Sequence, residues 1–163
     1  MTEQEYNRCV KDHADSVFRF IFKNLRHRED ARDVVQSAFE KMWANRSTVD
    51  PERCKSFLFT VAYHQMIDHI RKSKVVIVKE DQIEERVTYN KVNGDTKKVL
   101  ETALARLNET HRSLVLLKDY EGYSYEEIGT ITGLSTSQVK VYLHRARLQL
   151  KSYLVSPENV LES

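Results

Sequence analysis

The sequence predicts an all-α protein made of two small helical domains joined by a linker, with a helix-turn-helix in the second domain. Helix breakers are scarce, since the 163 residues include 4 glycines and 2 prolines, and the first glycine is Gly94. Apolar residues recur at helical spacing along most of the chain. The segment 75–96, VVIVKEDQIEERVTYNKVNGDT, interrupts that spacing and is the predicted linker.

Three helices are predicted for the first domain, residues 1–74. The first fits Glu3 to about Asn24 and the second fits Glu29 to Asn45. The third begins at Asp50-Pro51, an N-cap residue followed by proline at the first helical position, and runs to about Lys72. Each carries apolar residues at or near helical spacing, which predicts that each packs one face into a common core.

Helical spacing resumes in the second domain, residues 97–155, and a short tail, 156–163, follows it. One apolar face runs from Val99 to Leu107, and a further helix is predicted to end near Gly122. We therefore expect the second domain to build its own small core.

Two helix starts separated by a tight turn define the predicted helix-turn-helix. Ser124 precedes Glu127 by three residues and Ser135 precedes Gln138 by three, and both pairs fit a capping box. Between them Gly133 can adopt the positive φ that a tight turn requires. A helix of about eight residues, a turn and a longer helix follow in that order, which is the layout of a helix-turn-helix.

The outer face of the longer helix is basic. No acid lies between Glu127 and Glu158, and such a stretch suits a helix that faces phosphates. We predict a DNA contact by this face; the alternative is an ordinary helical hairpin with a solvated basic side. The candidate DNA-binding residues are Thr136, Ser137, Lys140, Val141, His144, Arg145 and Arg147.

Composition excludes several classes of protein. No apolar run is long enough to span a membrane, and the polar N-terminus is unlike a signal peptide, so we expect a cytoplasmic protein without membrane insertion. Cys9 and Cys54 lack the spacing of a zinc site or a disulfide framework, and we expect two half-buried reduced thiols. No phosphate-binding loop, metal set or nucleophile motif occurs, so we expect neither enzyme activity nor a cofactor. The histidines are scattered, at His13, His27, His64, His69, His111 and His144.

The second predicted helix is too apolar for an ordinary surface helix. Phe39, Met42 and Trp43 cannot all lie in the core if Val34 and Val35 also do. Either this helix is buried nearly all round, or it offers one face to a partner protein. The residues alone leave both alternatives open.

Three segments in order carry a resemblance to a known family. They read DARDVVQSAFEKMW, SFLFTVAYHQMIDHIRKSK and LARLNETHRSLVLLKDYEGYSYEEIGTITGLSTSQVKVYLHRARLQL. Together they resemble the signature segments of bacterial extracytoplasmic-function sigma factors, the small two-domain members of the sigma-70 family. The resemblance extends from about Tyr6 to Tyr153, with the linker between the second and third segments.

The resemblance implies a promoter-specificity subunit that binds promoter DNA and the β and β′ subunits of core RNA polymerase, and that an anti-sigma factor holds when free. The first domain would bind the clamp helices of β′ and read the minus-ten element. The second domain would read the minus-thirty-five element. The residues matching the polymerase-binding motif, or lying on its helix, are Asp30, Asp33, Gln36, Phe39 and Trp43.

For the minus-ten element the resemblance implies the loop Asn45–Glu52 and the helix Phe57–Lys72. Flipped bases need aromatic stacking surfaces, and the phosphates of the DNA strand need cationic side chains. Phe57 is a further aromatic candidate, although it also suits a position in the core. The candidate residues are Arg46, Ser47, Tyr63, His64, His69, Arg71 and Lys72, with Lys74 as a further backbone contact. About 17 base pairs separate the two elements, or about 58 Å of duplex, which an extended linker of this length can span at about 3.3 Å per residue.

The recognition helix departs from the family pattern. It has Ser137-Gln138 where the family often has Gly-Thr, and Val141-Tyr142 where the family often has Ser-Arg, so its target sequence is left open. The runner-up function is a stand-alone transcriptional regulator that dimerises through the first domain. A third is an interaction protein that does not bind DNA. The Asp30–Trp43 helix discriminates the sigma factor from the dimeric regulator. A polymerase-binding helix should capture core enzyme, whereas a dimer interface would be buried against a second copy of the chain.

Overall fold

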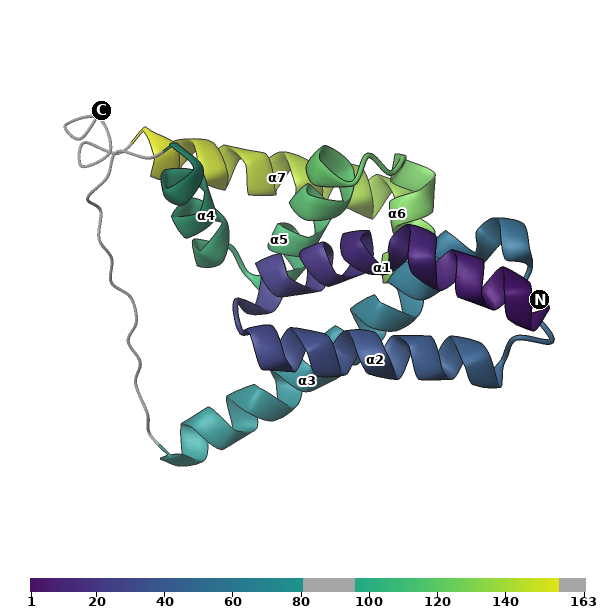
Figure 1. Ribbon diagram of the computed structural model, residues 1–163. Coiled ribbons are helices and arrows are strands. Elements are labelled where there is room, and N and C mark those ends of the chain that lie inside the picture. The colour runs from purple at the N-terminus through teal and green to yellow at the C-terminus, as the bar shows by residue number, and fades with distance from the viewer. Residues whose placement is uncertain (81–95, 156–163) are drawn as a thin grey trace.

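The computed structural model describes residues 1–80 and 96–155, and every regular element in those ranges is helical. The first domain consists of α1 (Glu3–Leu25), α2 (Arg28–Ala44) and α3 (Cys54–Glu80), with a 3-10 turn, η1 (Pro51–Arg53), leading into α3. The three helices pack against one another, and α2 lies on the far side of α1 from α7 (Thr136–Leu154) of the second domain (Figure 1). The all-α prediction is confirmed.

Local capping explains where α1 and α2 begin and end. Thr2 and Glu5 form a capping box at the start of α1, and Arg26 adopts φ 58° to end it. The His27 ring accepts a hydrogen bond from the Asp30 amide at the start of α2. The fully buried large side chains of this domain are Phe20, Ile21, Met42, Leu58, Phe59 and Met66.

The helix α3 extends further than the sequence predicted. We expected it to end near Lys72 and the linker to begin at residue 75, but the helix continues to Glu80. No glycine or proline interrupts VVIVKE, and the β-branched residues in it lower helix propensity only slightly. The remainder of the predicted linker, 81–95, and the tail, 156–163, lie outside the described residues.

The second domain contains α4 (Thr96–Arg106), α5 (Glu109–Val115), the π-helical turn η3 (Leu116–Tyr120), α6 (Tyr125–Thr132) and α7 (Thr136–Leu154). The long helix α7 packs on α4, α5 and α6. Leu114, Leu116, Leu117, Ile128, Ile131 and Leu143 form the centre of its core. The predicted resumption of helix near Lys97 and its break near Gly122 are both observed.

The two domains pack directly on each other, α3 against α6 and α1 against α5. The side-chain oxygen Oδ1 of the buried Asn24 accepts hydrogen bonds from Arg112 Nε at 3.2 Å and Ser113 Oγ at 3.1 Å. At one side Arg19 donates two hydrogen bonds, each 3.1 Å, to the buried carboxylate of Glu121. Polar pairs thus hold part of this contact, and buried apolar side chains of both domains, such as Phe59 and Tyr123, hold the rest.

The cysteines correct our expectation. Cys9 and Cys54 are joined by a disulfide between α1 and the start of α3, with their Cα atoms 6.4 Å apart. They are 3% and 7% exposed, so they are buried and not half-buried. A separation of 45 residues in sequence left no spacing from which this contact could be inferred. Among the described residues, no helix is both long and apolar enough to cross a membrane.

Candidate functional site

The turn between α6 and α7 has the predicted geometry. Ser124 and Glu127 exchange hydrogen bonds of 3.1 and 2.8 Å at the start of α6. Ser135 and Gln138 do the same at 3.1 and 2.9 Å at the start of α7. Gly133 lies at φ 84°, in the left-handed region where glycine carries no steric cost. Both capping boxes and the glycine turn are confirmed.

A second glycine requirement was not recognised from the sequence. A Cβ atom placed on Gly129 would lie 2.8 Å from the carbonyl oxygen of Leu134, on the far side of the turn. The chain therefore crosses α6 at a point where only glycine leaves room. The signal was present as a glycine within a short helix, a position that otherwise costs about 1 kcal/mol relative to alanine.

The helix α7 has one buried and one exposed face. Its buried residues are Val139, Leu143, Ala146 and Leu150, as the spacing predicted. All seven predicted DNA-binding residues are exposed, namely Thr136, Ser137, Lys140, Val141, His144, Arg145 and Arg147. Val141 is 46% exposed, which leaves its methyl groups free for contact. The structure therefore brings these residues together on one continuous surface.

The cations on this surface are not equally available. Lys140 Nζ lies 5.4 Å from the centre of the Tyr125 ring, and Arg145 lies 6.0 Å from that of Tyr142. Arg147 instead donates to Asp119 at 2.6 Å, and this bond raises the pKa of the guanidinium. The Arg147 charge is thus partly neutralised within the protein, whereas Lys140 presents its full charge.

The loop between α2 and η1 is held at both ends. The guanidinium of Arg46 lies 3.8 Å above the Trp43 ring and donates to the Trp43 carbonyl at 2.8 Å. The amino terminus of Met1 donates to the Arg46 carbonyl at 2.6 Å, a contact that sequence reasoning missed. Ser47 stands exposed between them and η1. Arg46 therefore holds the conformation of the loop and also contributes a positive charge to it.

The candidates on α3 divide into free and engaged groups. His64 and Lys72 are exposed. Arg71 lies 3.6 Å from Asp68, and His69 Nε2 lies 3.1 Å from an Asp30 carboxylate oxygen on α2. Phe57 is half-buried against the core. The structure gives no description of the Lys74 side chain.

Tyr63 is covered in this arrangement. It is 6% exposed, and burial is the main cause that raises the pKa of its hydroxyl. The next cause is the charge of Glu109, and a side-chain hydrogen bond with Thr110 opposes both. Glu109 and Thr110 belong to α5, so the second domain lies over this predicted stacking residue.

The helix α2 resolves the two alternatives left by its composition. Met42 is fully buried and Phe39 is half-buried, but Trp43 is 37% exposed. Asp33 and Gln36 are exposed, and Asp30 is half-buried beside His69. Spacings of three and four residues place the polar groups on one face of the helix. This helix is not buried all round, because it leaves a polar stripe ending at Trp43 open to solvent.

Comparison with known proteins identifies the class. Residues 9–75 match the family described as "Sigma-70 region 2", and residues 97–150 match "Sigma-70, region 4". The chain is 32% identical to the RNA polymerase sigma factor SigV of Bacillus subtilis, over 87% of this chain and 89% of that protein. It is 31% identical to the ECF RNA polymerase sigma factor SigL of Mycobacterium tuberculosis, over 83% of this chain and 80% of that one.

A solved structure shares the fold. The sigma factor RpoE of Bartonella quintana, in complex with the anti-sigma factor NepR, superposes with a TM-score of 0.79 at 22% identity. The match covers 94% of this chain and 99% of that one. Fold and sequence together define a two-domain sigma factor. The chain belongs to the extracytoplasmic-function sigma factors of the sigma-70 family, and it is a promoter-specificity subunit of bacterial RNA polymerase. The relatives are sigma factors, a class of proteins that are not enzymes.

Proposed function

We propose that three separate surfaces of this sigma factor divide its work: α2 binds the polymerase, the loop 45–52 with α3 reads the minus-ten element, and α7 reads the minus-thirty-five element. The domain limits we assign are 1–74 and 97–155, although the helix α3 itself continues past residue 74. The observation that carries the proposal is the polar stripe on α2, which neither domain covers.

The chemistry of α2 favours a different protein as its partner. Asp33, Gln36 and Glu40 are exposed, and Gln36 is fixed by a hydrogen bond of 3.3 Å to Glu40. Self-association through this stripe would bring carboxylates toward carboxylates, which opposes a symmetric dimer. A basic or amide-rich partner surface with a pocket for Trp43 would be complementary. The alternative of a dimeric stand-alone regulator gains no support from this face.

Reading the minus-ten element requires exposed aromatic and cationic groups near the loop. His64 can stack on an unpaired base, and Lys72 can pair with a phosphate without rearrangement. Tyr63 can stack on an unpaired base only after α5 moves away from it. We therefore assign Ser47, His64 and Lys72 to the first contact, and Tyr63 to a contact made after the domains separate.

Reading the minus-thirty-five element falls to α7. Lys140 and Arg145 suit phosphates or guanine edges, and the exposed Val141 suits a thymine methyl group. Ser137 stands near the N-terminus of the helix, the part that enters a major groove. Because Val141 and Tyr142 replace the family's usual polar pair, we expect this promoter element to differ from those of its relatives.

We further propose that the protein acts in the cytoplasm, performs no catalysis of its own and is bound by an anti-sigma factor when free. The support is the structural neighbour RpoE, whose solved complex contains the anti-sigma factor NepR. The arrangement of packed domains seen here leaves α2 and α7 open for such a protein.

Transcription in vitro with core RNA polymerase tests the proposal. We expect the chain to direct new initiation from a matching promoter, and Asp33→Lys to weaken binding to core polymerase about tenfold, as loss of a central interface contact would. Lys41→Glu is the matched control, because Lys41 is exposed on the same helix outside the stripe. A chain that directs no initiation, or that footprints DNA as a dimer without polymerase, contradicts the proposal.

A further inference from the structure

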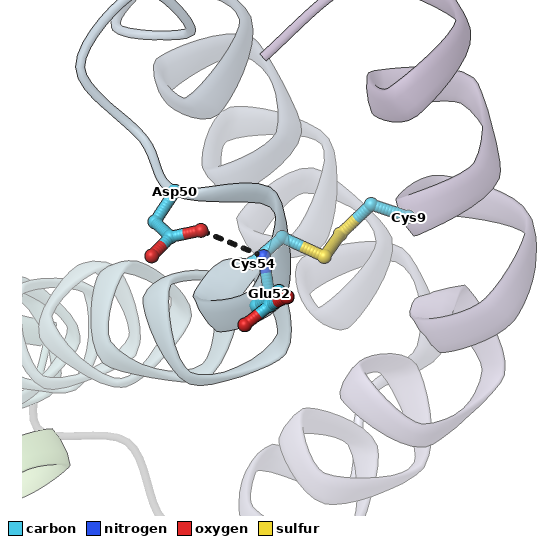
Figure 2. Close-up of a disulfide and its surroundings, with 4 residues drawn as sticks. All are labelled: Cys9, Asp50, Glu52 and Cys54. Carbon is cyan, nitrogen blue, oxygen red and sulfur yellow. Dashed lines mark hydrogen bonds between the residues drawn. A yellow bond between two sulfur atoms is a disulfide. The ribbon is translucent and has the colours of Figure 1, made fainter.

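Three potentially reactive side chains gather between α1 and α3, apart from the surfaces on α2 and α7 and next to the loop 45–52. Cys9 and His13 lie one turn apart on α1, and Cys54 is the first residue of α3. The two sulfur atoms and a ring nitrogen of His13 lie within 4.8 Å of one another. Figure 2 shows the disulfide bridging the two helices beside the turn that holds Asp50 and Glu52.

The surroundings of the pair suit thiol chemistry. Burial is the main cause that lowers the pKa of His13, Lys55 lowers it further, and Asp12 opposes them. The imidazole is therefore neutral at pH 7 and can accept a thiol proton. Cys54 lies at the N-terminus of a long helix, where the positive end of the helix dipole favours negative charge. Its 7% exposure exceeds the 3% of Cys9, so it is the sulfur that a small oxidant reaches first.

We propose that Cys9 and Cys54 are a reversible thiol–disulfide site that takes a hydroperoxide as its oxidant. In the first step the Cys54 thiol gives its proton to His13, and the sulfur attacks the peroxide. A sulfur–oxygen bond forms, the oxygen–oxygen bond breaks, and the departing alkoxide, or hydroxide from hydrogen peroxide, takes the proton from His13 to become the alcohol or water.

In the second step the Cys9 sulfur attacks the sulfenic acid on Cys54. The sulfur–sulfur bond forms, the sulfur–oxygen bond breaks, and the hydroxyl leaves as water with the Cys9 proton. The two sulfurs lose two electrons in total and the peroxide gains them. Exchange with a small-molecule thiol in excess reverses the reaction and returns both cysteines to the reduced state.

The Cys9–Cys54 disulfide would restrict the neighbouring loop 45–52. Cys54 directly follows η1, and the loop before η1 is already tied to the start of α1 through Met1, which donates to the carbonyls of Arg46 and Val49. The disulfide adds a covalent tie between the same two parts of the chain. If the loop reads the minus-ten element, as proposed above, oxidation restricts the movement it needs on DNA.

Mass spectrometry of the full chain tests the site itself, independently of any promoter activity. Addition of hydrogen peroxide to the reduced chain should remove two hydrogens and cross-link the Cys9 and Cys54 peptides within one molecule. The rate should exceed that in the urea-unfolded chain about tenfold, because folding supplies the neighbouring base and the second thiol. In Cys9→Ser, dimedone should label Cys54.

The role of His13 is that of a positioning and proton-accepting residue, and it has its own readout. His13→Ala should slow oxidation about tenfold and abolish the inflection of its pH profile near the imidazole titration, while the folded spectrum is retained. Lys11→Ala is the matched control, since Lys11 is exposed on the same helix between the two groups. Equal rates for His13→Ala and the control overturn the assignment to His13.

Two results would contradict the proposed thiol–disulfide site. One is oxidation no faster than in the unfolded chain, or only between molecules. The other is a reduced chain that resists peroxide and instead binds one Zn²⁺ through the three side chains, seen as sulfur-to-cobalt charge transfer when Co²⁺ is substituted.

Transcription in vitro separately tests whether the disulfide affects promoter opening. The oxidised chain should form open complexes about threefold less, and Cys9→Ser/Cys54→Ser should not respond to peroxide. Equal transcription by both redox forms overturns the coupling.

Discussion

The glycine at 129 illustrates how a single missing side chain sets the position of the recognition helix. Alanine is favoured over glycine in a helix by about 1 kcal/mol, but a Cβ here would lie 2.8 Å from a backbone oxygen. Overpacking of that kind costs about 1–3 kcal/mol. We expect Gly129→Ala to lower the free energy of unfolding by about 1 kcal/mol, measured by urea denaturation, and to impair promoter use more than this loss explains.

The control for that variant is Gly122→Ala. Gly122 has φ 78° and open space around it, so alanine meets no atom and carries only the left-handed strain of about 1–2 kcal/mol. Its destabilisation should leave promoter use unaffected, because Gly122 precedes α6 and does not touch the turn. A Gly129→Ala protein with normal promoter use would mean that the Leu134 carbonyl can retreat without moving α7.

The two cations Lys140 and Arg147 provide a second test at the scale of single residues. Lys140→Ala should lower the slope of log affinity against log salt by about 1 for holoenzyme on promoter DNA, because one phosphate contact is lost. Arg147→Ala should lower it less, since Arg147 is already paired with Asp119 at 2.6 Å. A larger effect of Arg147→Ala would mean that DNA displaces Asp119 from this pair.

At the scale of elements, the sequence predicted what local interactions determine. The starts of α6 and α7 follow from serine and its partner three residues later, and the buried stripe of α7 follows from helical spacing. The end of α3 could not be predicted, because VVIVKE carries neither a helical stripe nor a breaker. The disulfide could not be predicted either, because it depends on the crossing of α1 and α3 rather than on any spacing.

The site residues likewise divide into those determined by a pattern within one helix and those determined by contacts between helices. The exposed face of α7 was predictable, since it is a periodic pattern within one helix, whereas the residues of α2 left open whether that helix is buried nearly all round. The burial of Tyr63 and the pairing of His69 with Asp30 were not predictable, because each depends on a partner from a different element. Contacts between elements decide which members of a predicted surface are available.

The disulfide gives a stability prediction at the element scale. A bond that closes a loop with a sequence separation of 45 restricts the unfolded chain, and the chain-entropy relation gives about 4 kcal/mol for a loop of that length. We expect reduction to lower the free energy of unfolding of the first domain by up to about that amount. Urea denaturation with and without a thiol reductant measures it, and Cys9→Ser/Cys54→Ser should match the reduced chain in both conditions. An unchanged midpoint would contradict the contact.

The whole molecule is smaller than the DNA span it serves. A compact chain of 163 residues has a radius of gyration of about 15 Å, or a diameter of about 40 Å. Two promoter elements about 17 base pairs apart lie about 58 Å from each other along the duplex. The packed arrangement in Figure 1 therefore cannot reach both elements at once. Contacts such as Phe59 with Tyr123, whose ring centres lie 5.2 Å apart, must break when the polymerase binds promoter DNA.

The pair formed by Arg19 and Glu121 allows that opening to be controlled. Glu121 is only 4% exposed while Arg19 is 47% exposed, so removing the cation leaves a largely buried carboxylate unpaired. We expect Arg19→Glu to destabilise the packed arrangement by about 2 kcal/mol, less than for a fully buried pair because water screens Arg19. Small-angle scattering should then show a larger radius of gyration, and core polymerase should bind the opened chain more tightly. The charge-swapped variant Arg19→Glu/Glu121→Arg should restore both values to those of the original chain. If the double variant stays expanded, the loss of packing does not come from breaking the Arg19–Glu121 pair, and this pair does not control the opening.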